Sequence, residues 1–107
     1  MKINRIAHLG VAVTDLQTAM DFFTGALPLE VTHTEEYGGM KIAFIPIGDS
    51  SVELIQDVSG ASAIKKFLDK NGEGIHHIAY EVDDIEEAIT ELKAKGIKLI
   101  DEKPRQG

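Results

Sequence analysis

The chain has 107 residues, 43% hydrophobic and 27% charged, a balance that is ordinary for one soluble globular domain. It has no cysteine, which excludes a disulfide framework, a thiolate metal ligand and a cysteine nucleophile. The net charge of −7 argues against sequence-independent nucleic-acid binding, which needs a basic surface. No apolar run is long enough to span a bilayer, and the N-terminus has no signal-peptide pattern. We therefore expect a cytoplasmic protein with no membrane or nucleic-acid partner.

The first predicted element is a strand that runs into a helix. Alternate apolar residues of this strand share one face, and His8 lies on the opposite face. The apolar residues are Leu9, Val11 and Val13. The following helix is predicted to begin with capping-box spacing at Thr14 and Gln17, and to end near Gly25. Its apolar stripe consists of Leu16, Ala19, Met20 and Phe23.

Three strands and a second helix are predicted next. The strands cover residues 30–37, 40–47 and 51–57, with turn signals at Gly38-Gly39 and Gly48-Asp49-Ser50 between them. Residues 63–70 then carry apolar side chains at helical spacing, and Gly72 is a suitable stop. The first half of the chain is therefore expected to be strand, helix and three strands, followed by a linking helix.

The second half begins as a repeat of the first. Residues 74–85 align with residues 5–16 without a gap, so that His77 lies 69 residues after His8. Asp83 and Glu86 repeat the capping-box spacing, and the helical stripe recurs. A last strand is predicted over residues 97–101. A histidine at the same point of two strands predicts two copies of one unit, each bringing a metal-type ligand to a shared centre.

The repeat also predicts the domain organisation. We expect a single domain over residues 1–107, with a first module over about 1–58, a linking helix over about 59–72 and a partial second module over about 73–107. A complete second module would continue with two further strands, and the counterpart of Glu53 would fall near position ~122. The second module is therefore expected to be truncated at its C-terminus.

The chain resembles the vicinal oxygen chelate superfamily, which includes glyoxalase I, extradiol dioxygenases and fosfomycin-resistance proteins. Within it, the chain is most similar to the methylmalonyl-CoA epimerase family. The resemblance is carried by residues 6–13, 43–49, 66–68, 72–85 and 101–105. It implies an α+β fold of paired βαβββ modules. Pro28 departs from the pattern, because the family usually has glycine after its first helix.

The resemblance implies a divalent metal held by one residue from each of four strands. His8, Glu53 and His77 match three of these ligands, and the fourth, a C-terminal glutamate, would lie beyond Gly107. Imidazole and carboxylate ligands together suit Co, Zn, Ni or Mn. The alternative for each histidine alone is a structural role with a satisfied hydrogen bond.

Other polar residues are given structural interpretations. His76 points to the opposite face from His77, and His33 is expected to be solvated. Gln56 is the alternative to Glu53 as a ligand, disfavoured because it falls on the face of the neighbouring apolar residues. The pair Lys65-Lys66 is interpreted as a solvated helix face.

The resemblance further implies a metal-dependent epimerase that interconverts the 2R and 2S forms of methylmalonyl-CoA through a metal-stabilised enolate, acting as a homodimer on an acyl-CoA substrate. A glyoxalase I-type lyase and a non-catalytic metal- or ligand-binding module stay open as alternatives. Inversion needs a base on one face of the substrate and an acid on the other. Relatives place a carboxylate on the strand after the Gly-Gly turn, but residues 40–44 hold none, so the second acid–base group is unassigned.

Overall fold

The computed structural model describes residues 1–100. Residues 6–79 form one compact unit, and residues 1–5 belong with residues 80–100 to another. The boundary between the units passes through two strands, so it does not follow the predicted modules, whose division stays a prediction. Across residues 1–100, no helix has the length and apolar character needed to cross a membrane.

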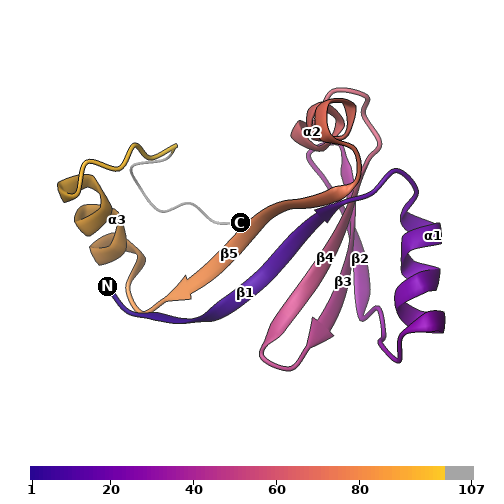
Figure 1. Ribbon diagram of the computed structural model, residues 1–107, viewed down its shortest axis with the longest axis horizontal. Helices are drawn as coiled ribbons and strands as arrows, with labels where there is room; N and C mark the ends of the chain where they lie inside the picture. The colour runs from indigo at the N-terminus through magenta and orange to yellow at the C-terminus, as the bar shows by residue number, and fades with distance from the viewer. Residues whose placement is uncertain (101–107) are drawn as a thin grey trace. The chain divides into compact units, whose positions relative to one another are not determined.

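The elements include a run of three consecutive strands between two helical segments (Figure 1). In chain order, the elements are β1 Ile3–Ala12, α1 Leu16–Asp21, the π-helix η1 Phe22–Ala26, β2 His33–Tyr37, β3 Met40–Ile47, β4 Ser50–Asp57, α2 Ala63–Asn71, β5 Gly74–Val82 and α3 Ile85–Ala94. The strands form one sheet in the order β2-β3-β4-β1-β5. This confirms the predicted α+β fold and the order strand, helix, three strands in the first half of the chain.

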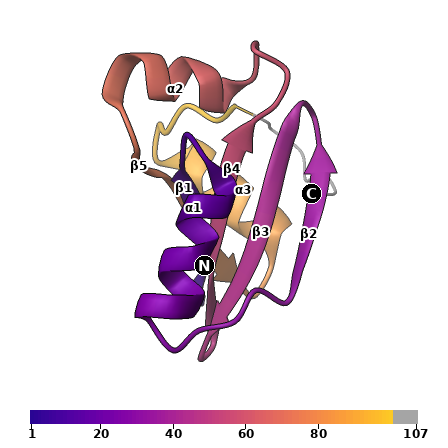
Figure 2. The ribbon, with the colours of Figure 1, turned by 90° about the vertical axis from the view of Figure 1, so that its right-hand side faces the viewer.

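The sheet is built on the hairpins of β2, β3 and β4, which lie side by side in Figure 2. Both hairpins pair antiparallel, whereas β1 pairs parallel with β4. A parallel pair requires a crossover connection, and the segment from α1 to β3 provides it. The turn between β2 and β3 uses Gly38 and Gly39, whose φ angles of 57° and 78° explain why glycine occupies both positions.

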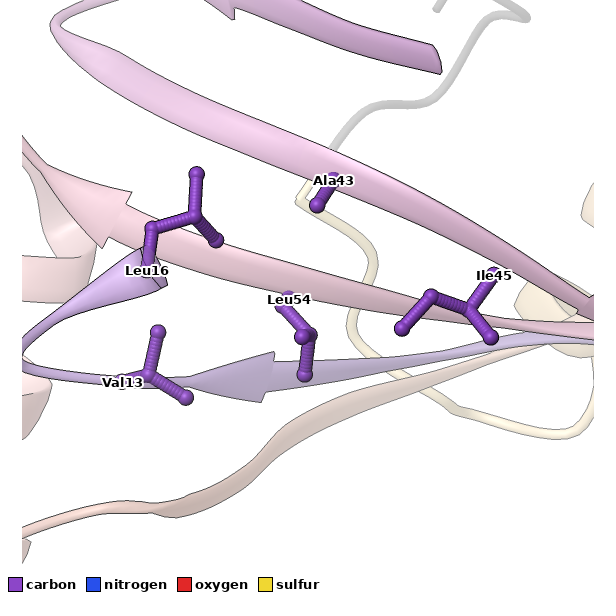
Figure 3. Packing of buried hydrophobic residues seen from close by; sticks show 5 residues of the cluster. All are labelled: Val13, Leu16, Ala43, Ile45 and Leu54. Carbon is purple, nitrogen blue, oxygen red and sulfur yellow. The ribbon is translucent and has the colours of Figure 1, made fainter. Parts of the chain in front are cut away.

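The two faces of the sheet bury different apolar clusters. The larger cluster lies under α1, and Figure 3 shows its side chains pointing toward one another. Its buried members are Val13, Leu16, Ala43, Ile45 and Leu54. The other cluster lies under α2 and contains Ala12, Ile55 and Ile64. Because side chains alternate along a strand, Leu54 and Ile55 serve opposite clusters, and Glu53 shares the α2 face with Ile55.

The helices α1 and α3 begin one residue later than the capping-box spacing predicts. The N-caps are Asp15 and Asp84, and each carboxylate accepts hydrogen bonds from two backbone N–H groups of the first turn. Thr14 instead donates its backbone N–H and its hydroxyl to Glu73, at 2.8 and 3.0 Å. An aspartate is as good an N-cap as threonine, so the neighbouring residue takes the role. The two caps still lie at equivalent positions of the repeat.

The end of α3 differs from the prediction of a strand over residues 97–101. Residues 97–100 form no strand, and Asp101 lies outside the described residues. Gly96 adopts a φ of 79°, and its N–H donates to the carbonyl of Lys93 while that of Ile97 donates to Leu92. These two bonds make a Schellman motif, which uses the backbone of Ile97 to close the helix rather than to start a strand ladder. The strand β2 also begins later than predicted, at His33 rather than Glu30.

Candidate functional site

Register across the sheet places one row of residues on the α2 face. Gly10 pairs with Glu53, Glu53 with Phe44, and Phe44 with His33. His8 lies two residues before Gly10 on β1 and therefore projects from the same face. The face opposite the α1 cluster thus carries two of the three predicted ligand residues on neighbouring strands.

The three predicted ligand residues are in contact through the ring of His8. Its Nδ1 lies 2.9 Å from Oε2 of Glu53, and its Nε2 lies 3.0 Å from Nε2 of His77. The two imidazole rings meet edge to face, with centroids 5.1 Å apart and planes at 87°. Residues that are 45 and 69 positions from His8 in the sequence are therefore brought to its two ring nitrogens.

His77 reaches this position because β1 has a glycine beneath its ring. A Cβ placed on Gly10 would lie 2.1 Å from Cε1 of His77 and 2.5 Å from its Nδ1. No side chain fits there, so Gly10 is a positioning residue that the sequence reasoning missed. Its signal was a glycine in the interior of a strand, which often marks the close approach of another group.

His76 also joins the cluster, contrary to the expectation that it points away. Its Nδ1 lies 3.0 Å from Nδ1 of His77, and its ring meets Phe67 of α2 edge to face at 5.1 Å. The alternation rule fixes Cβ directions only. The His76 ring is therefore not separated from His77, although the two residues are adjacent on β5.

The contacts fit one set of neutral tautomers. A proton on Nδ1 of His8 donates to Glu53, which leaves Nε2 of His8 to accept from Nε2–H of His77. Nδ1 of His77 then accepts from Nδ1–H of His76. Each ring donates once along the chain that ends at the carboxylate. Hydrogen bonding of this kind fixes which nitrogen of a ligand histidine keeps its lone pair.

Burial sets the electrostatics of the cluster. Burial raises the pKa of the Glu53 carboxyl, the charge of His8 lowers it, and the charge of Glu35 raises it further. Burial also lowers the pKa of His77, and the neighbouring His8 and His76 lower it in the same direction. The pKa shift of His77 favours the neutral imidazole, which is the form that binds a metal.

The remaining polar candidates have other roles. Oε1 of Gln56 accepts the backbone N–H of Leu16 at 2.6 Å, so this amide closes the start of α1 on the face opposite the cluster. The exposed ring of His33 stacks on Phe44, with centroids 4.2 Å apart and planes at 6°. Lys65 pairs with Asp69 on the surface of α2, as expected of a solvated helix face.

The chemistry of these three side chains suits a divalent metal, but their arrangement in the structure does not. Two imidazoles and a carboxylate are ligands of Zn, Co, Ni and Mn, and Nε2 of His8 and of His77 are already neighbours. Glu53, however, lies at Nδ1 of His8, on the other side of that ring. Throughout the described part of the chain, no group of three or more His, Asp or Glu residues is arranged to hold a metal ion. The metal and its three ligands therefore stay predictions.

Comparison with known proteins identifies the family. The model of the Glyoxalase/Bleomycin resistance protein/Dioxygenase superfamily matches residues 7–107. The chain belongs to this superfamily. It is 36% identical over 110 residues to the mitochondrial methylmalonyl-CoA epimerase of Mus musculus, covering 99% of this chain and 61% of the mouse protein. The chain thus spans less than two thirds of that relative.

Two bacterial relatives give the same resemblance. The ethylmalonyl-CoA/methylmalonyl-CoA epimerase of Cereibacter sphaeroides is 37% identical over 101 residues, covering 92% of this chain and 75% of that protein. The structure of Streptomyces coelicolor methylmalonyl-CoA epimerase with 2-nitronate-propionyl-CoA has a TM-score of 0.91 and 33% identity, covering 99% of this chain and 79% of that chain. The predicted resemblance to the methylmalonyl-CoA epimerases is confirmed.

Proposed function

We propose that the protein is a metal-dependent epimerase that interconverts the 2R and 2S forms of methylmalonyl-CoA. The observation that carries the proposal is the contact of His8 with both Glu53 and His77, in a chain similar to named epimerases over nearly its whole length. A solved relative, a methylmalonyl-CoA epimerase, binds methylmalonyl-CoA. A small acyl-CoA substrate is therefore the partner that we assign to this site.

The residues of the cluster have separate tasks in this proposal. Neutral His8 and His77 would hold the metal through Nε2, which for His77 requires its proton to move from Nε2 to Nδ1. Glu53 would be the third ligand from this chain, for which its carboxylate would have to leave Nδ1 of His8. A bound divalent metal supplies the positive charge that offsets negative charge developing on the substrate's thioester oxygen when the α-proton leaves. The bond from Nδ1 of His8 to Glu53 is an alternative to metal ligation by Glu53, and it leaves the Nε2 lone pair of His8 available.

The test is epimerisation of each methylmalonyl-CoA epimer in the presence of cobalt or zinc, followed in deuterated water. We expect the protein to convert each epimer into the other with incorporation of deuterium at the α-carbon. His8→Ala and His77→Ala should lose both conversion and tight metal binding, because each removes one imidazole ligand. Asp69→Asn, on the surface of α2, is the control. Wild-type conversion and metal affinity in either alanine variant would refute the shared site.

A glyoxalase I-type lyase is the second candidate. It is favoured by 27% identity over 100 residues to the lactoylglutathione lyase of Neisseria meningitidis, covering 92% of this chain. The same three residues would serve that reaction, so only substrates separate the two. Turnover of the hemithioacetal of methylglyoxal and glutathione, with no change in either methylmalonyl-CoA epimer, would favour the lyase. Metal binding without turnover of either substrate would favour a non-catalytic binding module.

Self-association as a homodimer is part of the proposal. It is supported by large apolar side chains at the surface of the unit of residues 6–79, among them Phe22 and Tyr37, which are 54% and 70% exposed. Sedimentation at micromolar concentration should give a dimer, and a monomer alone would count against it. The cytoplasmic location stays a prediction.

A further inference from the structure

Inversion of a carbon centre requires proton transfer on both of its faces, and β3 does not supply a group for this. Two residues before Phe44 on β3 is Ile42, which projects from the same face as Glu53. Its side chain is aliphatic and cannot transfer a proton. General acid–base catalysis needs a carboxyl or imidazole within hydrogen-bond reach of the substrate. We therefore ask which neighbouring strand of the described residues brings a carboxylate to this face.

The strand β2 brings a carboxylate to the place that β3 leaves apolar. Glu35 pairs with Ile42, and Ile42 pairs with Ile55 on β4. Since side chains alternate, Glu35 projects from the face that carries Ile55 and Glu53. The carboxylate of Glu35 thus lies one strand farther from β1 than a carboxylate on β3 would, on the same side of the sheet.

The other carboxylates of β2 and β4 either project from the opposite face or have hydrogen-bond partners of their own. Glu36 pairs with Lys41 and projects from the opposite face. Asp57 accepts hydrogen bonds from Ser59 Oγ and from two backbone N–H groups of the following loop. Its hydrogen bond with the Ser62 side chain, together with these bonds, holds its pKa at about 2. Glu53 is in contact with His8. Among the carboxylates of β2, β3 and β4, this leaves Glu35.

The surroundings of Glu35 suit a group that meets a substrate. Its side chain is 56% exposed, and its Oε1 lies 3.4 Å from Nε2 of His33. The ring of His33 is stacked on Phe44, directly beside Glu53 in the same row. Glu35 is also within electrostatic reach of the site, because its charge is one cause of the raised pKa of Glu53, after burial and the opposing effect of His8.

We propose that Glu35 is the acid–base residue for one face of the substrate's α-carbon. This inference rests on the proposed function. In one direction the carboxylate of Glu35 takes the α-proton and becomes a carboxylic acid, while the electron pair of the C–H bond stays on the substrate as the enolate. In the other direction the acid returns that proton to the same face, after a second group has removed the proton of the opposite face.

Hydrogen exchange of the two separate epimers in deuterated water tests the inference. The wild-type protein should invert both epimers with incorporation of deuterium. Glu35→Gln should slow inversion by about 10²-fold or more. One epimer, whose proton faces the second group, should still exchange that proton without inversion, whereas the other epimer should neither exchange nor invert. Glu35→Asp should recover part of the rate, because it keeps the carboxylate with a shorter reach.

Two further measurements separate a catalytic from a structural role. Glu36→Gln, the neighbour on the opposite face, should behave as wild type. Binding of propionyl-CoA, which lacks the carboxylate and is not epimerised, should be unchanged in Glu35→Gln. Inversion at the wild-type rate in Glu35→Gln would overturn the inference and leave the proposed function standing, as would equal loss of exchange in both epimers. Absence of exchange and inversion in the wild type would overturn both.

Discussion

The contact between Gly10 and His77 makes a quantitative prediction about a single methyl group. In Gly10→Ala the new Cβ would lie 2.1 Å from Cε1 of His77 and 2.6 Å from its Nε2. Carbon atoms in ordinary contact are about 3.5–4.0 Å apart, so the ring must move by about 1.5 Å. A movement of that size breaks the 3.0 Å contact between Nε2 of His8 and of His77. We expect a loss of about 1–3 kcal/mol in unfolding free energy and a 10–100-fold loss in metal affinity.

The assay is denaturant unfolding together with titration of cobalt into the purified protein. Gly74→Ala is the matched control, because Gly74 also lies in a strand and nothing approaches its Cβ position within 4 Å. That variant should keep metal affinity and lose no stability, since alanine restricts the unfolded chain. The reasoning is refuted if Gly10→Ala binds cobalt as tightly as the parent, because His77 would then not need the space above Gly10.

Three further predictions concern pH, the core and a helix cap. The pKa of His77 is lowered in the folded state, so His77 binds a proton more readily when unfolded. The unfolding free energy should therefore fall as pH drops below about 6.5. His77→Gln should flatten this dependence, measured by urea titrations at several pH values. Leu54→Ala, at a fully buried position under α1, should cost about 2–5 kcal/mol by the same unfolding assay. Asp15→Ala should cost about 0.5–2 kcal/mol through loss of the N-cap of α1, and an unchanged denaturation midpoint would contradict the capping assignment.

The sequence predicted the parts of the fold that depend on side-chain period. Alternation along β4 assigned Leu54 and Glu53 to opposite faces, and the structure agrees. Alternation along β1 likewise separated His8 from Val11 and Val13, which pack toward α1. These predictions succeed because the direction of a Cβ follows from the strand conformation alone.

Features that depend on neighbours in space were not readable in this way. Thr14 donates its backbone N–H and hydroxyl to Glu73, which is distant in sequence, while Asp15 caps α1. The absence of a strand at residues 97–100 follows from the helix-closing bonds of Gly96 and Ile97. Local spacing permitted either outcome in both places; a contact with the distant Glu73 accompanies the first, and local helix-closing bonds decide the second.

The sequence repeat places one histidine on each of two neighbouring strands, and the residue at position 10 decides whether the two rings can meet. Position 10 and position 79 are equivalent in the two copies, but the first is glycine and the second is alanine. A symmetric repeat with alanine at both positions would place a methyl group where the ring of His77 lies. The contact between the two Nε2 atoms therefore requires glycine at position 10. His8 contacts Glu53 on the neighbouring strand β4 and His77 contacts His76, so two residues that are equivalent in sequence have different partners. The repeat brings two imidazoles to neighbouring strands, and the glycine at position 10 leaves room for the ring of His77 over β1.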